Sequence, residues 1–176
     1  MSASIGHVLP PSLDEADAGE VASKGQLLPL SWQALNHDDE LMEQSLNPHV
    51  VVLTDALQLA NRPGRLVEAI LVVKKRFPGA LLWTPGIGGP DNCAVLSWFG
   101  VDLFDTTRTK QAEAHGAVLT WNGPRNAIEG ESANSHWRSA LAEVRSAIMS
   151  NSLRELAQSQ SLNSPRLVEH IRNHDK

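Results

Sequence analysis

Short apolar runs alternate with longer amphipathic segments through the middle of the chain. Residues 50–54, which read VVVLT, form a β-branched run, and residues 80–83 and 101–105 are two further apolar runs too short for a helix. Residues 66–76 and 91–99 lie between them, and their apolar positions recur every three or four residues, as on one face of a helix. The order strand, helix, strand, helix, strand predicts a parallel sheet, so the expected fold class is α/β.

Single residues mark the predicted ends of the helices. Asp91 is the expected N-cap of the second helix, because its carboxylate can accept a hydrogen bond from an orphan N–H group, and Gly100 is placed to end that helix. Asn134 or Ser135 is expected to cap a longer helix further along the chain. Residues 164–165, Ser followed by Pro, predict the N-cap and first turn of a last short helix.

The chain divides into three predicted parts. Residues 1–47 are expected to form a flexible or poorly structured N-terminal arm, because most of them are polar or are Pro and Gly, with a short helix around residues 38–45. Residues 48–132 hold the strands and helices of a partial βα domain. Residues 133–176 are expected to be C-terminal helices that pack on it.

Length and composition narrow the classes of protein. The chain has 176 residues, whereas a complete (β/α)8 barrel needs about 250. Its 15 basic and 20 acidic residues give a net charge of -5, so we expect weak RNA binding by the chain alone. It has no run of about 18 apolar residues and its start lacks the features of a signal peptide, so we expect a cytoplasmic protein without a membrane partner.

Metal and cofactor chemistry has little support in the sequence. The one cysteine, Cys93, excludes an internal disulfide and a multi-cysteine zinc site. The seven histidines are scattered, without metal-ligand spacing to a carboxylate or thiol. We therefore expect no metal and no cofactor.

Polar or glycine residues follow each of the three predicted strands. Asp55 ends the first strand, a turn built on Gly86, Gly88 and Gly89 follows the second, and Asp105 ends the third. The carboxyl ends of parallel strands meet at one rim, where α/β folds bind ligands. The two aspartates are candidate catalytic residues that could share a pocket. The three glycines are candidate substrate-binding residues whose N–H groups could cradle a phosphate or a purine edge.

Each of these residues also has a structural interpretation. Asp105 can cap its loop by accepting hydrogen bonds from the N–H groups of Thr107 or Arg108, as Asx turns do. Asp55 can cap a helix or a turn, and the glycines can serve a tight connection that needs positive φ. Thr107 and Arg108 are the remaining candidate substrate-binding residues.

Four segments between residues 86 and 124 resemble the tRNA-guanine transglycosylase family. They read GIGGP at residues 86–90, GVDLFD at residues 100–105, Gly116, and TWNGP at residues 120–124. The step from Asp105 to Gly116 keeps the family's length without a gap. The similarity is strongest to the reduced domain at the front of archaeosine synthases. It implies a partial, truncated TIM-barrel-like fold and a place in 7-deazaguanine modification of tRNA, of the archaeosine or queuosine type.

The resemblance gives Asp105 a role, but the sequence also departs from the family. In the family the matching aspartate attacks the ribose C1′ as guanine leaves. The family's next segment carries arginines, and here the corresponding positions read Thr109, Lys110 and Gln111. The early strands and the zinc-binding residues of the complete barrel have no counterpart. The resemblance therefore implies an accessory or split subunit: if active, it is a pentosyltransferase or archaeosine synthase component that acts only with a partner.

Three interpretations of the function remain open. As part of a split enzyme, the chain would use Asp105 as a nucleophile beside a complementary catalytic subunit. As a binding module, it would dock tRNA or that subunit and use Asp105 structurally. Open sheet edges are normally covered, so a homo-oligomer is a further expectation. The third interpretation is a stand-alone α/β protein that binds a purine base or a phosphate at the Gly86 turn.

Overall fold

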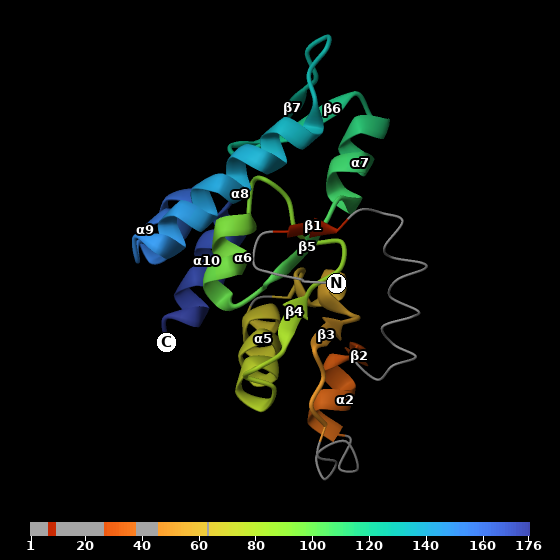
Figure 1. Cartoon of the computed structure of the whole chain (residues 1–176), viewed down its shortest axis with the longest axis vertical. Helices are drawn as coiled ribbons and strands as arrows, with labels where there is room; N and C mark the ends of the chain where they lie inside the picture. The colour runs from red at the N-terminus through yellow and green to blue at the C-terminus, as the bar shows by residue number, and fades with distance from the viewer. Residues whose placement is uncertain (1–6, 10–26, 38–45, 63) are drawn as a thin grey trace.

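The computed structural model describes residues 7–9, 27–37, 46–62 and 64–176. In this part of the chain five strands form one sheet, in the order β1-β5-β4-β3-β2, and all neighbouring pairs are parallel (Figure 1). A separate antiparallel hairpin consists of β6 and β7. The strands are β1 (His7–Leu9), β2 (Leu27–Leu30), β3 (Val50–Leu53), β4 (Leu81–Trp83), β5 (Leu103–Asp105), β6 (Ala117–Thr120) and β7 (Gly123–Asn126).

Helices follow the strands of the parallel sheet and then continue to the C-terminus. They are α2 (Trp32–His37), α4 (Ala56–Leu59), α5 (Arg65–Arg76), α6 (Cys93–Phe99), α7 (Thr107–Ala114), α8 (Ala133–Met149), α9 (Leu153–Ser161) and α10 (Pro165–His174). The predicted α/β class is confirmed, and so is the order of strands and helices from β3 to β5. Within the described residues no helix is long and apolar enough to cross a membrane.

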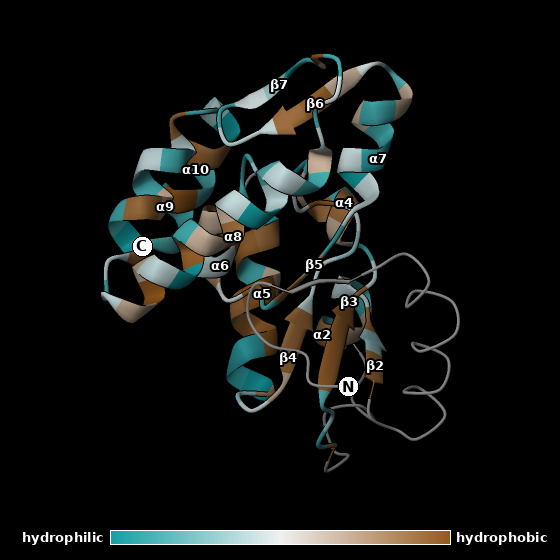
Figure 2. Ribbon diagram, turned by 45° about the horizontal axis from the view of Figure 1, so that its top comes forward, coloured by the Kyte–Doolittle hydropathy of each residue, from teal (hydrophilic) through white to brown (hydrophobic). Residues whose placement is uncertain are grey.

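The two faces of the sheet enter different apolar clusters. Alternate strand residues join the main core together with buried side chains of the helices. On the other face a small cluster consists, among the described residues, of strand side chains alone. The first set is Val51, Leu53, Leu82 and Phe104, and the second is Val50, Val52, Trp83 and Leu103. The period of two along each strand produces this division, and the hydrophobic colour of β3 and β4 is visible in Figure 2.

The C-terminal helices belong to the same core as the sheet. Helices α8, α9 and α10 all contact α6, beside which they lie in Figure 1. Trp137 and Val144 of α8 are buried there, as are Ala157 of α9 and Ile171 of α10. These three helices therefore cover α6.

The structure corrects the prediction of a flexible arm where residues 27–37 are concerned. This segment forms β2 and α2, and Leu27 to Leu30 pair in register with Val50 to Leu53. Leu30 and Leu35 are buried in the main core. The apolar residues of this segment thus extend the sheet beyond β3. Apart from residues 7–9 and 46–47, the rest of the predicted arm lies outside the described residues, as does the predicted helix around residues 38–45.

The sequence patterns did not predict helix α7 or strand β7. The polar stretch after Asp105 forms α7, of which only Thr109 is buried, so it lacks the apolar stripe that would have identified it. Residues 123–126, which carry no apolar alternation in the sequence, form β7, which completes the hairpin with β6. The helix caps differ as well. Asn92 rather than Asp91 is the N-cap of α6, and Ser132 is the N-cap of α8.

Other helix ends agree with the sequence patterns. Gly100 ends α6 with φ of 112°, a left-handed conformation that glycine adopts without steric cost. Ser164 is the N-cap of α10, with Pro165 in its first turn.

A partly buried ion pair links α5 to the sheet. The Nζ atom of Lys74 lies 2.5 Å from Oδ2 of Asp102, and the same oxygen accepts a hydrogen bond of 2.8 Å from the N–H group of Leu82. The side chain of Asp102 is 8% exposed and that of Lys74 is 27% exposed. The pair holds the helix after β3 against the start of β5.

Replacing Lys74 by Met should destabilise the fold, because the buried Asp102 would lose its cation. Since Lys74 is partly exposed, we expect a loss of about 2 kcal/mol, below the cost of breaking a fully buried pair. Urea unfolding followed by circular dichroism measures the change. Lys75→Met alters the neighbouring exposed lysine and should change stability by less than about 0.5 kcal/mol. Equal effects of the two substitutions would contradict a structural role for the ion pair.

Candidate functional site

Three neighbouring strands end at the rim that carries the candidate residues. Strand β3 leads to Asp55, β4 leads to the glycine turn, and β5 ends at Asp105. Because β4 lies between β3 and β5, the strands that carry the two aspartates are about 10 Å apart. The two carboxylates accept hydrogen bonds from different parts of the chain.

Asp105 is buried and accepts three hydrogen bonds. Its Oδ2 atom accepts from the indole N–H group of Trp83 at 3.0 Å and from the backbone N–H group of Gly86 at 2.9 Å. Its Oδ1 atom accepts from the N–H group of Thr107 at 3.0 Å. The residue is only 3% exposed. The carboxylate therefore joins β4, the glycine turn and the start of α7, and the bond to Thr107 is the Asx-type contact that the structural interpretation requires.

Asp55 serves another helix. Its two carboxylate oxygens lie 3.2 and 3.0 Å from the backbone nitrogen of Trp32, the first residue of α2. A carboxylate in this position accepts a hydrogen bond from an N–H group that has no partner within the helix. Its negative charge is also stabilised by the positive end of the helix dipole. Its hydrogen bonds therefore agree with the helix-cap interpretation of Asp55.

Two N–H donors of the glycine turn are used within the protein. The N–H group of Gly86 binds Asp105, and that of Gly89 donates to Oδ1 of Asn92 at 2.8 Å. Gly86 has φ of 76°, which favours glycine, whereas a Cβ atom on Gly88 would lie 2.6 Å from the ring of Phe104. These contacts match the tight-connection interpretation, and they engage the N–H groups of Gly86 and Gly89 that a phosphate would need.

Gln160 of α9 occupies the N-terminus of α6. Its Oε1 atom accepts hydrogen bonds from the N–H groups of Ala94 and Val95 at 2.8 and 3.2 Å, and its Nε2 atom donates to the carbonyl of Pro90 at 3.0 Å. The side chain is fully buried, at 0% exposure. The helix end at which a phosphate could be held is thus already filled from within the chain.

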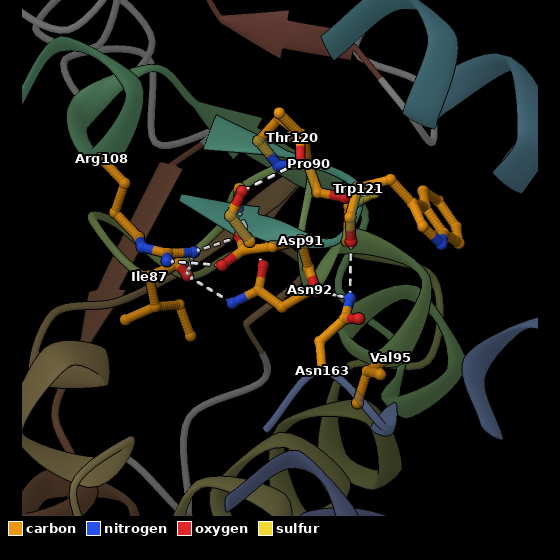
Figure 3. A network of polar contacts seen from close by, with 12 residues as sticks. Ile87, Pro90, Asp91, Asn92, Val95, Arg108, Thr120, Trp121 and Asn163 are labelled. Carbon is orange, nitrogen blue, oxygen red and sulfur yellow. Dashed lines mark hydrogen bonds and ion pairs between the residues drawn. The ribbon is translucent and has the colours of Figure 1, made fainter. Parts of the chain in front are cut away.

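Arg108 forms a bidentate ion pair across the rim. Its Nη1 and Nη2 atoms lie 2.7 and 2.8 Å from the two carboxylate oxygens of Asp91, as Figure 3 shows. The pair explains why Asp91 is not the N-cap of α6. A Cβ atom on Gly89 would lie 2.5 Å from Asp91 and 2.6 Å from Arg108, so this glycine leaves room for the pair. Thr107, the other candidate, contributes its N–H group to Asp105.

Asn163, between α9 and α10, ties the hairpin to the glycine turn. Its Nδ2 atom donates to the carbonyls of Asp91 at 3.3 Å and Trp121 at 2.5 Å (Figure 3). The C-terminal segment thus helps to build the rim. None of the predicted site residues belongs to that segment.

A cavity of about 330 Å³ opens behind the glycine turn. Its lining comes from α4 and the residues after it, the start of α5, the turn, α6, α7 and α10. Arg108 belongs to it, together with Gly86 and Ile87, so the cavity adjoins the predicted rim. Its size falls within the usual range of small-molecule sites.

His170 of α10 is a buried member of this cavity. The residue is 3% exposed and its Nδ1 atom has no hydrogen-bond partner. Burial lowers the pKa of His170 below the ordinary 6.5, against the opposing effects of the Ala60 backbone and the Glu169 charge, and the Arg166 cation lowers it further. The imidazole is therefore held neutral at pH 7 inside a cavity that also contains Arg108 and Asp91.

The described residues offer little to a metal ion or a reactive thiol. Among them, no group of three or more His, Cys, Asp or Glu side chains could hold a metal. Cys93 has 0% exposure, and burial raises the pKa of its thiol to about 12. A thiol of this kind is almost entirely protonated at pH 7 and is a poor nucleophile.

Gln160 and His170 were missed as functional positions, although the sequence carries a signal for both. Gln160 continues the apolar spacing of Leu153, Leu156 and Ala157, and His170 adjoins Ile171 on the apolar side of the last helix. A polar residue on such a stripe is either exposed or has a buried partner, and only the structure distinguishes the two. The sequence has no comparable pattern that would predict the ion pair between Asp91 and Arg108.

Comparison with known proteins gives one similarity and no family assignment. No family model matches the chain. Over 73 residues, 41% of the chain, it is 32% identical to archaeosine synthase subunit alpha from Methanosarcina acetivorans. The aligned stretch makes up 12% of the length of that protein. The similarity supports the relationship to transglycosylase-like proteins that the motifs around Gly86 and Asp105 indicate.

Replacing Gln160 by Met should be costly, because the N–H groups of Ala94 and Val95 would be left buried without an acceptor. We expect a loss of about 3 kcal/mol in the free energy of unfolding, measured by urea titration. Gln158→Met changes an exposed residue of the same helix and is the matched control. A stability of Gln160→Met equal to that of the control would show that the helix end does not depend on this side chain.

The stability of the protein should fall between pH 7 and pH 5. The lowered pKa of His170 means that the unfolded chain binds the proton more tightly, so protonation favours unfolding once the pH drops below about 6.5. His170→Gln should flatten this part of the profile, whereas His115→Gln, at an exposed position, should not. Glu131 does not contribute to the change between pH 7 and pH 5, because hydrogen bonds from Arg125 and then from His136 lower its pKa to about 2. Thermal unfolding across this pH range is the measurement, and an unchanged slope in His170→Gln would refute the assignment.

Proposed function

We propose that the protein is a transglycosylase-like component of tRNA modification in the 7-deazaguanine pathway, and that it acts as an accessory or split subunit. The observation that carries the proposal is the similarity to archaeosine synthase subunit alpha over 73 residues. Of the motifs that suggest this family, the glycine turn from Gly86 and the residue Asp105 lie at the rim. The proposed work of the chain is to position tRNA or a catalytic partner.

The topology of the sheet supports a partial barrel as the fold. Strands β2, β3, β4 and β5 are neighbours in sequence order, and each pair is parallel. Their second face carries an apolar cluster without helical side chains among the described residues. In a (β/α)8 barrel, consecutive strands have this arrangement and their inner face is packed by strand side chains. We infer that residues 48–132 are barrel-like, and that a partner subunit or a second copy of the chain completes the packing.

The environment of Asp105 favours positioning over nucleophilic attack. A nucleophilic carboxylate needs an oxygen that is free to meet the substrate. Both oxygens of Asp105 accept hydrogen bonds from the protein, and the residue is buried. Asp55, the second candidate, caps α2. The split-enzyme interpretation requires substrate to reach this buried carboxylate in the complete assembly, where Oδ1 accepts the single bond from Thr107.

Asp105→Asn separates the two interpretations. The amide can replace only one oxygen as an acceptor, so we expect a loss of about 1–3 kcal/mol in stability. If Asp105 only shapes the rim, the variant still supports modification wherever it remains folded. The experiment replaces the gene in the organism that encodes it and measures 7-deazaguanine nucleosides in total tRNA by mass spectrometry.

Asp102→Asn is the matched control, because it alters another buried, hydrogen-bonded acid just before the same strand. Deletion of the gene should abolish or reduce the modification, and both variants should restore it in proportion to their abundance. Loss of modification in Asp105→Asn alone, at normal abundance, would establish the nucleophile and overturn the accessory role. Unchanged tRNA nucleosides after deletion would overturn the place in the pathway.

A further inference from the structure

The cavity behind the glycine turn combines an apolar interior with a polar entrance. Leu66, Leu96 and Phe99 contribute buried apolar surface to its walls. Exposed side chains, among them Asn61 and Arg166, belong to the same lining and mark the side that faces solvent. A ligand that fits must therefore carry an apolar part for the interior and a polar part for the entrance.

Arg166 gives the entrance a cation with donors to spare. Its Nη1 atom lies 2.6 Å from Oδ1 of Asn61, a neutral partner. A guanidinium has five N–H donors in a planar fork, so the remaining donors can bind an anion. Arg166 also lies in the first turn of the ten-residue helix α10, whose positive end favours a negative group. Arg108, in contrast, already has Asp91 as its counter-ion.

His170 supplies an unused polar atom in the interior. Its Nδ1 atom is buried without a hydrogen-bond partner, and buried polar groups normally have one. The residue lines the cavity one helical turn after Arg166. Gln111 of α7 belongs to the same lining, and its carboxamide offers both a donor and an acceptor. A heterocyclic base has the flat apolar faces and the polar edge that this lining can contact.

We propose that this cavity is a binding site for a phosphorylated nucleoside, with the base inside the cavity and the phosphate at Arg166. A cavity of about 330 Å³ has the size expected for a ligand of this class. The ligand can be a free mononucleotide or a nucleotide of a single-stranded RNA, since both present the same chemistry. The proposal goes beyond the proposed function, because it needs no reaction at Asp105 and no modification pathway.

The test measures binding of GMP and AMP to the full chain by calorimetry. We expect one site per chain, with weaker binding of the nucleosides and of inorganic phosphate alone, since each lacks half of the contacts. Arg166→Gln should weaken nucleotide binding by about tenfold to a hundredfold, because a charged hydrogen bond is lost. Arg172→Gln removes an exposed arginine from the last turn of the same helix and should leave binding unchanged.

Nuclear magnetic resonance adds a readout at His170 itself. The imidazole signals of His170 should shift on addition of GMP, because the base would lie against its unpartnered Nδ1 atom. The signals of exposed His115 are the internal reference and should not move. A His170 that is insensitive to saturating nucleotide would overturn the placement of the base.

A short single-stranded RNA distinguishes the two sources of the ligand. If RNA binding depends on Arg166 and is displaced by GMP, the site takes a nucleotide of a nucleic acid. If GMP binds but RNA does not, the ligand is a free nucleotide. Absence of binding by both at millimolar concentration would overturn the proposal, as would equal weakening by Arg166→Gln and Arg172→Gln. None of these outcomes depends on tRNA nucleosides in the cell, so this proposal and the proposed function can fail separately.

Discussion

The carboxylate of Asp105 gathers three N–H donors from three parts of the chain, and the shape of the rim depends on that arrangement. A buried charge is costly unless hydrogen bonds or a counter-ion compensate it. Trp83, Gly86 and Thr107 provide the hydrogen bonds here. The glycine turn and the start of α7 are thereby fixed relative to each other. Arg108, the second residue of α7, then lies where it reaches Asp91 on the other side of the turn.

The C-terminal helices complete this arrangement. Gln160 supplies the acceptor that the first N–H groups of α6 need, and Asn163 binds carbonyl groups of both the turn before α6 and the β6–β7 hairpin. Arg166 and His170 then form one wall of the cavity. Residues more than 40 positions apart in sequence therefore build a single surface. The strands of this surface resemble part of a barrel. The polar side chains that bind and line it come equally from the C-terminal helices.

The local patterns of the sequence predicted the strands and helices of the middle of the chain, because burial imposes a period of two or 3.6 on apolar residues. The patterns also identified Gly100 and Ser164 as helix-end residues. They failed for α7, whose contacts with the core are few, and for β2 and α2, which lie in a predicted arm.

The sequence predicted where the candidate site lies, but not which hydrogen bonds its residues form. Strand order alone places Asp55, the glycine turn and Asp105 on one edge. Which donor each carboxylate meets depends on residues 2 to 23 positions away, and such pairings leave no periodic trace. The same holds for Gln160, whose partners lie 65 to 70 positions earlier.

The single thiol of the chain reports on the motions of this arrangement. Cys93 begins α6, has no exposed surface and remains protonated at neutral pH. A thiol-specific reagent can reach its sulfur only when α6 separates from its covering helices. When reclosing is faster than labelling, the labelling rate equals the fraction of molecules that are open multiplied by the intrinsic labelling rate of the thiol. The wild-type chain therefore carries its own sensor of local unfolding, and no engineered label is needed to measure the fraction of molecules in which α6 and α9 are separated.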